Sequence, residues 1–191
     1  GGTLGKRLID FATMLVGRFH GGLGQVTVVG STVFGGVSGS AVAEASALGS
    51  MLIPWQKREG YPGAFAAAAT ASSATIAGLI PPSIPLILYA AVSNQSIATL
   101  FLAGLVPGLM LCVGFMLTCY LSGRLRGFKR LAGEVTLKGV LRVTIAAMPA
   151  LAMPAFIVVL LRAGIATPTE VSVLAVFYGL MVSMLVYRDL T

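Results

Sequence analysis

The segment that decides the fold runs from Phe34 to Tyr89 and starts with Gly35-Gly36-Val37-Ser38-Gly39-Ser40. Near its other end it contains Leu79-Ile80-Pro81-Pro82-Ser83-Ile84-Pro85. Both clusters consist of small, polar or helix-breaking residues, and both lie within apolar sequence. Non-helical backbone at membrane depth is tolerated only where it is buried in protein or lines a wet cavity. Two neighbouring breaks of this kind are typical of secondary transporters, so the segment predicts a transport site.

The composition places the whole chain in a membrane. Hydrophobic residues make up 57% of the sequence and charged residues only 10%, whereas a soluble domain has about 25% charged residues. Only helices and closed barrels span a bilayer, and the recurring long apolar segments favour helices. We therefore expect an all-α, polytopic membrane protein. The net charge of +7 comes from residues between apolar segments, which the positive-inside rule explains better than nucleic-acid binding does.

The first third of the chain predicts a helical hairpin that enters the membrane without crossing it. Residues 1–20 are expected to form an amphipathic helix that lies in the membrane interface. Residues 21–56 predict a re-entrant hairpin, because 22–36 and 41–54 are each only about 20 Å long as helices. That length is too short for a hydrocarbon core of about 30 Å. The hairpin is expected to turn at Ser38-Gly39-Ser40.

The remaining segments predict one broken helix and three full spans. Residues 60–121 are expected to hold a transmembrane helix broken at Pro81-Pro82, with Ser83 as the cap of its second half, and then a complete span. Gly104 and Gly108 in that span are interpreted as helix-packing residues. Residues 122–142 form a basic connection, and 143–191 two further transmembrane helices.

The positive charges orient these segments. Of the 13 Lys and Arg residues, all but Arg162 fall on one face of the predicted topology. By the positive-inside rule that face is cytoplasmic. The hairpin is therefore expected to enter the membrane from the cytoplasm.

The two breaks suggest a cation site made of oxygen atoms. A half-helix that ends inside the membrane leaves carbonyl groups unpaired, and these suit a cation such as Na⁺. Hydroxyl groups add further oxygens, and glycines allow a close approach of the backbone. We expect Na⁺ to be bound by backbone and hydroxyl oxygens of Ser38, Gly39, Ser40, Ile80, Pro81 and Ser83. Ser40 and Ser83 are also the candidate substrate-binding residues.

Other interpretations of these residues stay open. Taken singly, Ser-Gly-Ser and Pro-Pro more often kink and pack membrane helices, and only their combination favours a site. Glu44 lies in an apolar helix, where a carboxylate suggests function, but it could equally bond the hairpin backbone. Glu170 lies next to a helix start, where Thr167 or Thr169 is the expected cap, and its acidic side chain is interpreted as stabilising that helix end.

At these residues the sequence resembles the large membrane subunit of tripartite ATP-independent periplasmic (TRAP) transporters, the DctM-like family. The motifs that carry the resemblance span nearly the whole chain: Ser38-Gly-Ser-Ala-Val-Ala-Glu44, Pro54 with Gly60-Tyr61, Ile80-Pro-Pro-Ser-Ile84, Ile87-Leu-Tyr89, Leu100-Phe-Leu-Ala-Gly104 with Pro107-Gly108, and Thr167-Pro-Thr-Glu170 with Tyr178.

The resemblance implies a Na⁺-coupled importer of organic acid anions, such as C4-dicarboxylates or sugar acids, that works by an elevator motion. It also implies a small membrane (DctQ-like) subunit, a periplasmic (DctP-like) binding protein and a place in the bacterial or archaeal cytoplasmic (inner) membrane. The family has two inverted repeats, each with a hairpin and a broken helix. Only the first set is found here, and 143–191 would start the second repeat. We therefore expect the chain to be a fragment of a longer subunit.

Two other functions fit the residues less well. One is a divalent-anion/Na⁺ symporter that needs no binding protein, and the other is a membrane scaffold that transports nothing. An enzyme is not expected, because no catalytic pair such as Ser/His or twin Asp is placed at matching depth. We expect Na⁺ as the coupling ion and no organic cofactor, and no partner among nucleic acids.

Overall fold

The computed structural model describes residues 3–128, 131, 137–163, 167–182 and 184, and every regular element among these residues is a helix. The elements are α1 (Thr3–Val16), α2 (Gly22–Ser38), α3 (Ala41–Arg58), α4 (Gly63–Ala74), the 3₁₀ turn η1 (Thr75–Gly78), α5 (Ile84–Ser93), α6 (Ile97–Leu125), α7 (Leu137–Arg162) and α8 (Pro168–Met181). The predicted all-α class is confirmed.

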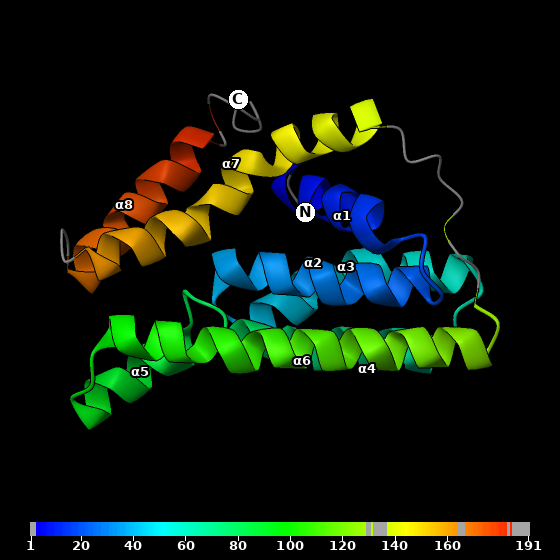
Figure 1. The fold of residues 1–191 in the computed structure, drawn as a ribbon, viewed down its shortest axis with the longest axis horizontal. Helices are drawn as coiled ribbons and strands as arrows, with labels where there is room; N and C mark the ends of the chain where they lie inside the picture. Colours follow the sequence, from blue (N-terminus) through cyan, green and yellow to red (C-terminus); the bar gives the residue numbers. More distant parts are fainter. Residues whose placement is uncertain (1–2, 129–130, 132–136, 164–166, 183, 185–191) are drawn as a thin grey trace.

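Helix α2 lies at the centre of the bundle and packs against α1, α3, α4 and α6 (Figure 1). Its two faces contribute to different cores. Val26 packs with residues of α1 and α3, whereas Val28 packs with Ile76 of η1 and Cys119 of α6. A helix that is apolar all round is expected to be buried, and most of α2 is buried.

The two arms of the hairpin, α2 and α3, are joined by a buried polar contact. Gln56 Nε2 donates a hydrogen bond to Thr27 Oγ1 at 2.7 Å, and Thr27 Oγ1 donates to the carbonyl of Leu23 at 2.9 Å. Both side chains are fully buried. A buried hydrogen bond of this kind fixes the register of the two arms, because leaving either group unpaired would cost about 1–3 kcal/mol.

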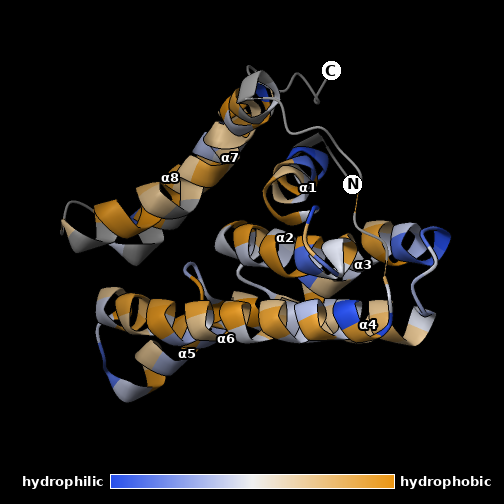
Figure 2. Cartoon of the chain, turned by 45° about the vertical axis from the view of Figure 1, so that its right-hand side comes forward, coloured by the Kyte–Doolittle hydropathy of each residue, from blue (hydrophilic) through white to orange (hydrophobic). Residues whose placement is uncertain are grey.

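Among the described residues, two helices are long and apolar enough to cross a membrane: Ile97–Leu125, which is α6, and Leu141–Leu160 within α7. Figure 2 shows hydrophobic residues along α6 and hydrophilic ones at the ends of α3 and α6. On α6 the side chains of Met110, Val113 and Leu117 are more than half exposed. Exposed apolar side chains in a continuous row fit contact with lipid or with further helices.

Several helices extend further than the sequence predicted. The hairpin arms have 17 and 18 residues, about 26 Å each at 1.5 Å per residue, so the predicted length of about 20 Å was too short. Helix α3 does not end at Pro54. Its last turn is kept by other backbone bonds, including Glu59 N–H to the carbonyl of Trp55 at 3.1 Å. The proline removes one donor and crowds the carbonyl four residues earlier, but the turn that follows it keeps its hydrogen bonds.

The connection predicted at 122–142 is shorter, because α6 continues to Leu125 and α7 begins at Leu137. Residues 129–130 and 132–136 of that connection lie outside the described residues, as do 164–166, 183 and 185–191. The predicted membrane boundaries, including re-entry from the cytoplasmic side, stay predictions.

The turn between α1 and α2 approaches α6 very closely at Gly123. A side chain added at Gly123 would collide with the backbone of Gly21, and one added at Gly21 would collide with the carbonyl of Cys119. Small residues permit such contacts between membrane helices. In α6 another glycine, Gly114, has open space around the position of a Cβ atom.

We expect Gly123→Ala to destabilise the protein by about 1–3 kcal/mol, because the added methyl group overpacks the contact with Gly21. Gly114→Ala is the matched control on the same helix and is expected to leave stability unchanged or slightly higher. Thermal unfolding of both variants in detergent checks this. Equal unfolding temperatures would contradict the close approach of the α1–α2 turn to α6.

Candidate functional site

The hairpin turns through a left-handed glycine followed by a capping serine. Gly39 has φ 63° and donates its N–H to the carbonyl of Gly35 at 3.0 Å. Ser40 begins α3, and its Oγ accepts a hydrogen bond from Ala43 N–H at 3.3 Å. Ser38 Oγ accepts from Ser40 N–H at 3.4 Å. A left-handed glycine and a serine N-cap are the residues that such a turn requires.

The broken helix is interrupted between η1 and α5. The Pro81-Pro82 peptide is cis, and α5 starts directly after Ser83. Ser83 Oγ accepts a hydrogen bond from Leu86 N–H at 3.4 Å and donates one to the carbonyl of Gly78 at 2.6 Å. The hydroxyl group therefore bridges the two halves of the helix. The sequence-based prediction that Ser83 caps the second half is confirmed.

The tip of the hairpin contacts this break directly. Ile84 N–H, the first donor of α5, binds the carbonyl of Gly39 at 3.2 Å. A side chain at Gly39 would collide with the carbonyl oxygen of Pro82. Two segments that are more than forty residues apart in the sequence thus meet through their backbones. Only glycine allows both the left-handed conformation and this close approach.

Helix α6 supports the break from the other side. A Cβ atom added at Gly104 would collide with the carbonyl oxygen of Leu79, and one added at Gly108 would lie 3.0 Å from Ile80 Cγ1. The interpretation of these glycines as packing residues is confirmed, with the break and helix α5 as their partners. The break is therefore held between the hairpin tip and α6.

The predicted site residues fall into two groups by exposure. Gly39, Ile80, Pro81 and Ser83 are buried, whereas Ser38 and Ser40 are partly exposed at the tip. The hydroxyl groups of Ser38 and Ser40 cap their own turn, and Ser83 Oγ caps α5. Each hydroxyl oxygen has two lone pairs, so each keeps acceptor capacity beyond these bonds.

The carboxylate of Glu44 lies near the tip and is fully buried. It is adjacent to Ser31 of α2, and a Cβ atom at Gly35 would lie 3.1 Å from its Oε2 and 2.9 Å from Ala77 Cα of η1. Within the described part of the chain, no hydrogen bond of 3.5 Å or less reaches either carboxylate oxygen or Ser31 Oγ. The Ser31 hydroxyl is nevertheless near enough to interact with the carboxylate. A buried carboxylate without a partner is costly unless a cation or a proton neutralises it.

Sequence reasoning singled out Glu44 without giving it a role, and it missed Ser31. The facing positions follow from how α2 and α3 pack, which a single sequence does not reveal. Ser73 of α4 was missed for the same reason, and its hydroxyl is also buried without a partner among the described residues. An intramembrane serine carries no local signal that separates a packing role from a binding role.

Glu170 belongs to a helix cap and not to this site. Its Oε2 accepts a hydrogen bond from Thr167 N–H at 2.7 Å, and Thr167 Oγ1 accepts one from Glu170 N–H at 3.4 Å. This reciprocal pair is a capping box. The backbone N–H of Thr167, and then its hydroxyl, lower the pKa of the Glu170 carboxyl group. The cap therefore stabilises the start of α8 at neutral pH and weakens as the pH falls through that lowered pKa.

The donor set near the tip consists of carbonyl, hydroxyl and carboxylate oxygens, which suit hard cations such as Na⁺. Transition metals prefer imidazole and thiolate ligands. Within the described residues no group of three His, Cys, Asp or Glu side chains could hold such a metal.

Comparison with known proteins identifies the family. Residues 1–191 match the family described as the tripartite ATP-independent periplasmic transporter, DctM component. The chain is 37% identical over 190 residues to the 2,3-diketo-L-gulonate TRAP transporter large permease protein YiaN of Escherichia coli, with 100% of the chain and 44% of that protein covered.

Two further relatives have other substrates in their names. The chain is 38% identical to the sialic acid TRAP transporter large permease protein SiaM of Vibrio cholerae, with 97% of the chain and 43% of the relative covered. It is 37% identical to the C4-dicarboxylate TRAP transporter large permease protein DctM of Pseudomonas aeruginosa, with 99% and 44% covered. The chain thus spans less than half the length of these relatives.

The resemblance drawn from the motifs is confirmed over the whole chain. The named relatives are permeases and not enzymes, which agrees with the expectation for this chain. Permeases are integral membrane proteins, and the apolar helices described above fit that class. The chain belongs to the DctM family, the large membrane component of TRAP transporters.

Proposed function

We propose that this chain forms part of a Na⁺-coupled importer of organic acid anions. Membership of a transporter family supports the general activity. The relatives are named for C4-dicarboxylate, sialic acid and 2,3-diketo-L-gulonate, and all three of these molecules carry carboxylate groups. A carboxylate-bearing substrate is therefore the common chemistry. We further propose a place in the cytoplasmic (inner) membrane, together with a small membrane subunit and a periplasmic binding protein.

The observation that carries the proposal is the hydrogen bond from Ile84 N–H to the carbonyl of Gly39 at 3.2 Å. It joins the hairpin tip to the start of α5 and so brings the tip next to the break. In this proposal Na⁺ binds backbone and hydroxyl oxygens of Ser38, Gly39, Ser40, Ile80, Pro81 and Ser83. Carbonyl oxygens at interrupted helices bind Na⁺ in transporters of several folds.

Glu44 gives this site its negative charge. Its carboxylate is buried, and the polar side chain beside it is that of Ser31. A monovalent cation nearby would offset the cost of burying that charge. Ser40 and Ser83 are the proposed substrate-binding residues. A substrate carboxylate next to the ion would accept a hydrogen bond from the Ser40 hydroxyl, and from the Ser83 hydroxyl only after that group leaves the carbonyl of Gly78. Movement of the hairpin, the break and the bound ion as one body would constitute the elevator step.

Uptake by the complete permease, reconstituted with its small subunit in proteoliposomes, tests this function. We expect import of a labelled organic acid to require both an inward Na⁺ gradient and the periplasmic binding protein. Replacing Na⁺ by K⁺ is expected to stop uptake, because K⁺ is too large for a compact oxygen cage.

The outcomes separate the competing functions. Uptake that needs Na⁺ but no binding protein would identify a simple symporter. Uptake that requires neither the Na⁺ gradient nor the binding protein would overturn the proposal. Ser83→Ala is expected to weaken the Na⁺ dependence about tenfold, since it removes one hydroxyl ligand worth about 1 kcal/mol or more. A non-transporting scaffold would show no Na⁺-driven uptake in the parent protein.

A further inference from the structure

Two cavities lie one after the other along the seam between α4 and α6. The first has a volume of about 490 Å³ and is formed where α6 ends, against the α3–α4 turn. The second has a volume of about 270 Å³ and lies deeper along the same two helices. Phe128 lines the first cavity and Phe65 the second, and their ring centroids are 5.0 Å apart. The two cavities are therefore neighbours.

The first cavity is basic and lies at the depth of lipid headgroups. Arg58 and Arg126 line it together with Glu59, which leaves a net charge of one positive. Helix α6 has 29 residues, about 43 Å at 1.5 Å per residue. That length matches a bilayer with both of its headgroup layers, about 40–45 Å. Arg126 follows the last residue of this helix, so it lies at the polar boundary.

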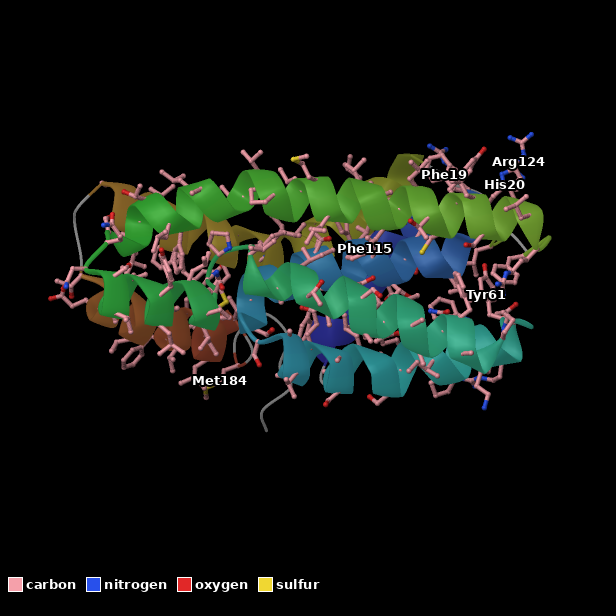
Figure 3. The ribbon with its side chains drawn as sticks, turned by 90° about the horizontal axis from the view of Figure 1, so that it is seen from below. Phe19, His20, Tyr61, Phe115, Arg124 and Met184 are labelled. Atoms are coloured by element: carbon pink, nitrogen blue, oxygen red, sulfur yellow. The ribbon has the colours of Figure 1, made fainter. Side chains whose placement is uncertain are left out.

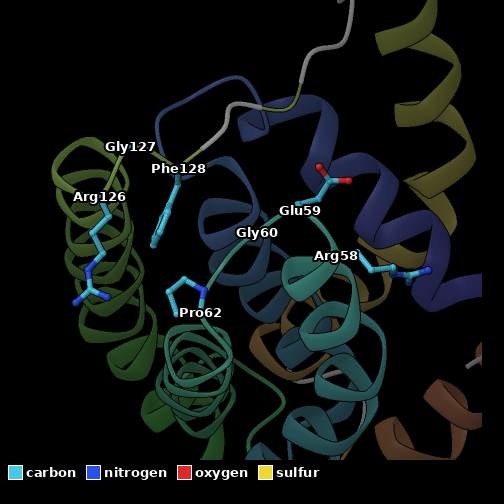
Figure 4. Close-up of a pocket in the computed structure, with 7 residues that line it drawn as sticks. All are labelled: Arg58, Glu59, Gly60, Pro62, Arg126, Gly127 and Phe128. Atoms are coloured by element: carbon cyan, nitrogen blue, oxygen red, sulfur yellow. The ribbon is translucent and has the colours of Figure 1, made fainter.

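Figure 4 shows how the lining residues are arranged. Arg126 and Phe128 extend from the end of α6 on the side of Pro62, which precedes α4, whereas Arg58 and Glu59 extend on the far side. Arg58 Nε also donates to the carbonyl of Pro54 at 3.3 Å. Arg126 is thus the anion-binding group of this cavity.

Aromatic residues hold the floor of this cavity in place. The ring of Phe128 packs against Tyr61 at a centroid distance of 4.4 Å and against Phe65 at 5.0 Å. Tyr61 is buried, and its hydroxyl accepts a hydrogen bond from Leu23 N–H at 3.4 Å. Aromatic side chains of this kind concentrate where hydrocarbon meets headgroups. They fix the boundary between the polar cavity and the apolar one.

The second cavity is a narrow groove with a mainly apolar lining. Phe65, Ala68 and Ser72 of α4 face Phe115, Thr118 and Cys119 of α6 across it. Figure 3 shows Phe115 between the two helices. The lining on α6 runs from Phe115 to Ser122, seven residues or about 10 Å along the axis. The groove can therefore hold part of one acyl chain.

We propose that the seam between α4 and α6 binds an anionic phospholipid, with its headgroup at Arg126 and one acyl chain in the groove. The seam presents a basic cavity, then an aromatic boundary, then an apolar groove. A phospholipid presents its charged headgroup and its acyl chain in the same order. The guanidinium group binds the phosphate. Phosphatidylglycerol, whose headgroup leaves the lipid with a net negative charge, is the expected lipid. Basic pockets between membrane helices are known to bind anionic lipids.

Native mass spectrometry of the complete permease in detergent tests this site with three probes: phosphatidylglycerol, phosphatidylcholine and glycerol 3-phosphate. We expect saturable binding of phosphatidylglycerol and much weaker binding of the other two. Arg126→Gln is expected to weaken binding of phosphatidylglycerol about fivefold. Ala68→Phe fills the groove and is expected to weaken it about tenfold.

Matched controls are available on the same helices. Arg124→Gln removes an exposed charge from the last turn of α6 that points away from Tyr61 (Figure 3). Ala67→Phe adds the same bulk as Ala68→Phe at an exposed position that does not line the groove. Both controls are expected to bind the lipid as the parent does. Thermal unfolding in lipid-free detergent confirms that each variant is folded.

Three results would overturn the proposal. A headgroup site would be excluded if phosphatidylglycerol and phosphatidylcholine bound equally well and if Arg126→Gln changed the binding of neither. The cavity would be a simple anion site if glycerol 3-phosphate bound as tightly as phosphatidylglycerol and if Ala68→Phe did not weaken the binding of phosphatidylglycerol. No lipid binding by the folded parent would show that other parts of the protein cover the seam.

Discussion

Replacing Gly39 by alanine is expected to reduce transport about thirtyfold or more. The residue has φ 63°, a conformation that costs a residue with a side chain roughly 1–2 kcal/mol. The added methyl group would also collide with the carbonyl oxygen of Pro82. One or two kcal/mol changes a population five- to thirtyfold, and the collision adds to it. The tip would therefore leave the break, and the two halves of the site would separate.

Gly30→Ala is the matched control for this prediction. Gly30 lies in α2, the same arm of the hairpin, and has open space around the position of a Cβ atom. Alanine is a better helix former than glycine, so this variant should be as stable as the parent or more so. Initial rates of Na⁺-driven uptake in proteoliposomes compare the two. If Gly39→Ala transports as well as Gly30→Ala, contact between tip and break is not needed for transport.

The second large effect is expected from Glu44→Gln. In the proposed site the carboxylate supplies the charge that holds Na⁺, and glutamine keeps its shape without that charge. Removing one partner of a buried ion pair costs about 3–5 kcal/mol, so the affinity for Na⁺ should fall about 100-fold or more. Because the unpaired buried charge disappears as well, the variant should unfold at the same or a higher temperature than the parent in Na⁺-free buffer.

Thermal unfolding with NaCl or KCl measures this directly. A ligand that binds only the folded state raises its stability with concentration, so Na⁺ should stabilise the parent but not Glu44→Gln. Asp10→Asn is the control, since it removes an exposed carboxylate from α1. Stabilisation by Na⁺ that is the same in all three proteins would exclude Glu44 from the site.

The sequence was informative wherever the chain departs from a regular helix. Ser-Gly-Ser and Pro-Pro mark the two breaks, because each needs residues that a membrane helix otherwise avoids. Gly39 at the left-handed position and Ser83 at the cap of α5 follow from the same local chemistry. These signals act within a few residues, so a single sequence contains them.

Helix boundaries and facing positions were harder to predict. Pro54 was taken as the end of α3, but the helix continues to Arg58 because the neighbouring residues keep their hydrogen bonds. Whether a helix tolerates an internal proline depends on its packing, which lies outside local sequence. The approach of Ser31 to Glu44 likewise depends on the rotation of α2 against α3, and no local pattern sets it.

The central claim is that the hairpin tip, the break and Glu44 form one Na⁺ site. Equilibrium binding of radioactive Na⁺ to the purified complete permease tests it most directly. The account predicts that Gly39→Ala, Ser83→Ala and Glu44→Gln each bind Na⁺ more weakly at the same single site, whereas Gly30→Ala and Asp10→Asn bind as the parent does. Unchanged Na⁺ binding in all three site variants would contradict it.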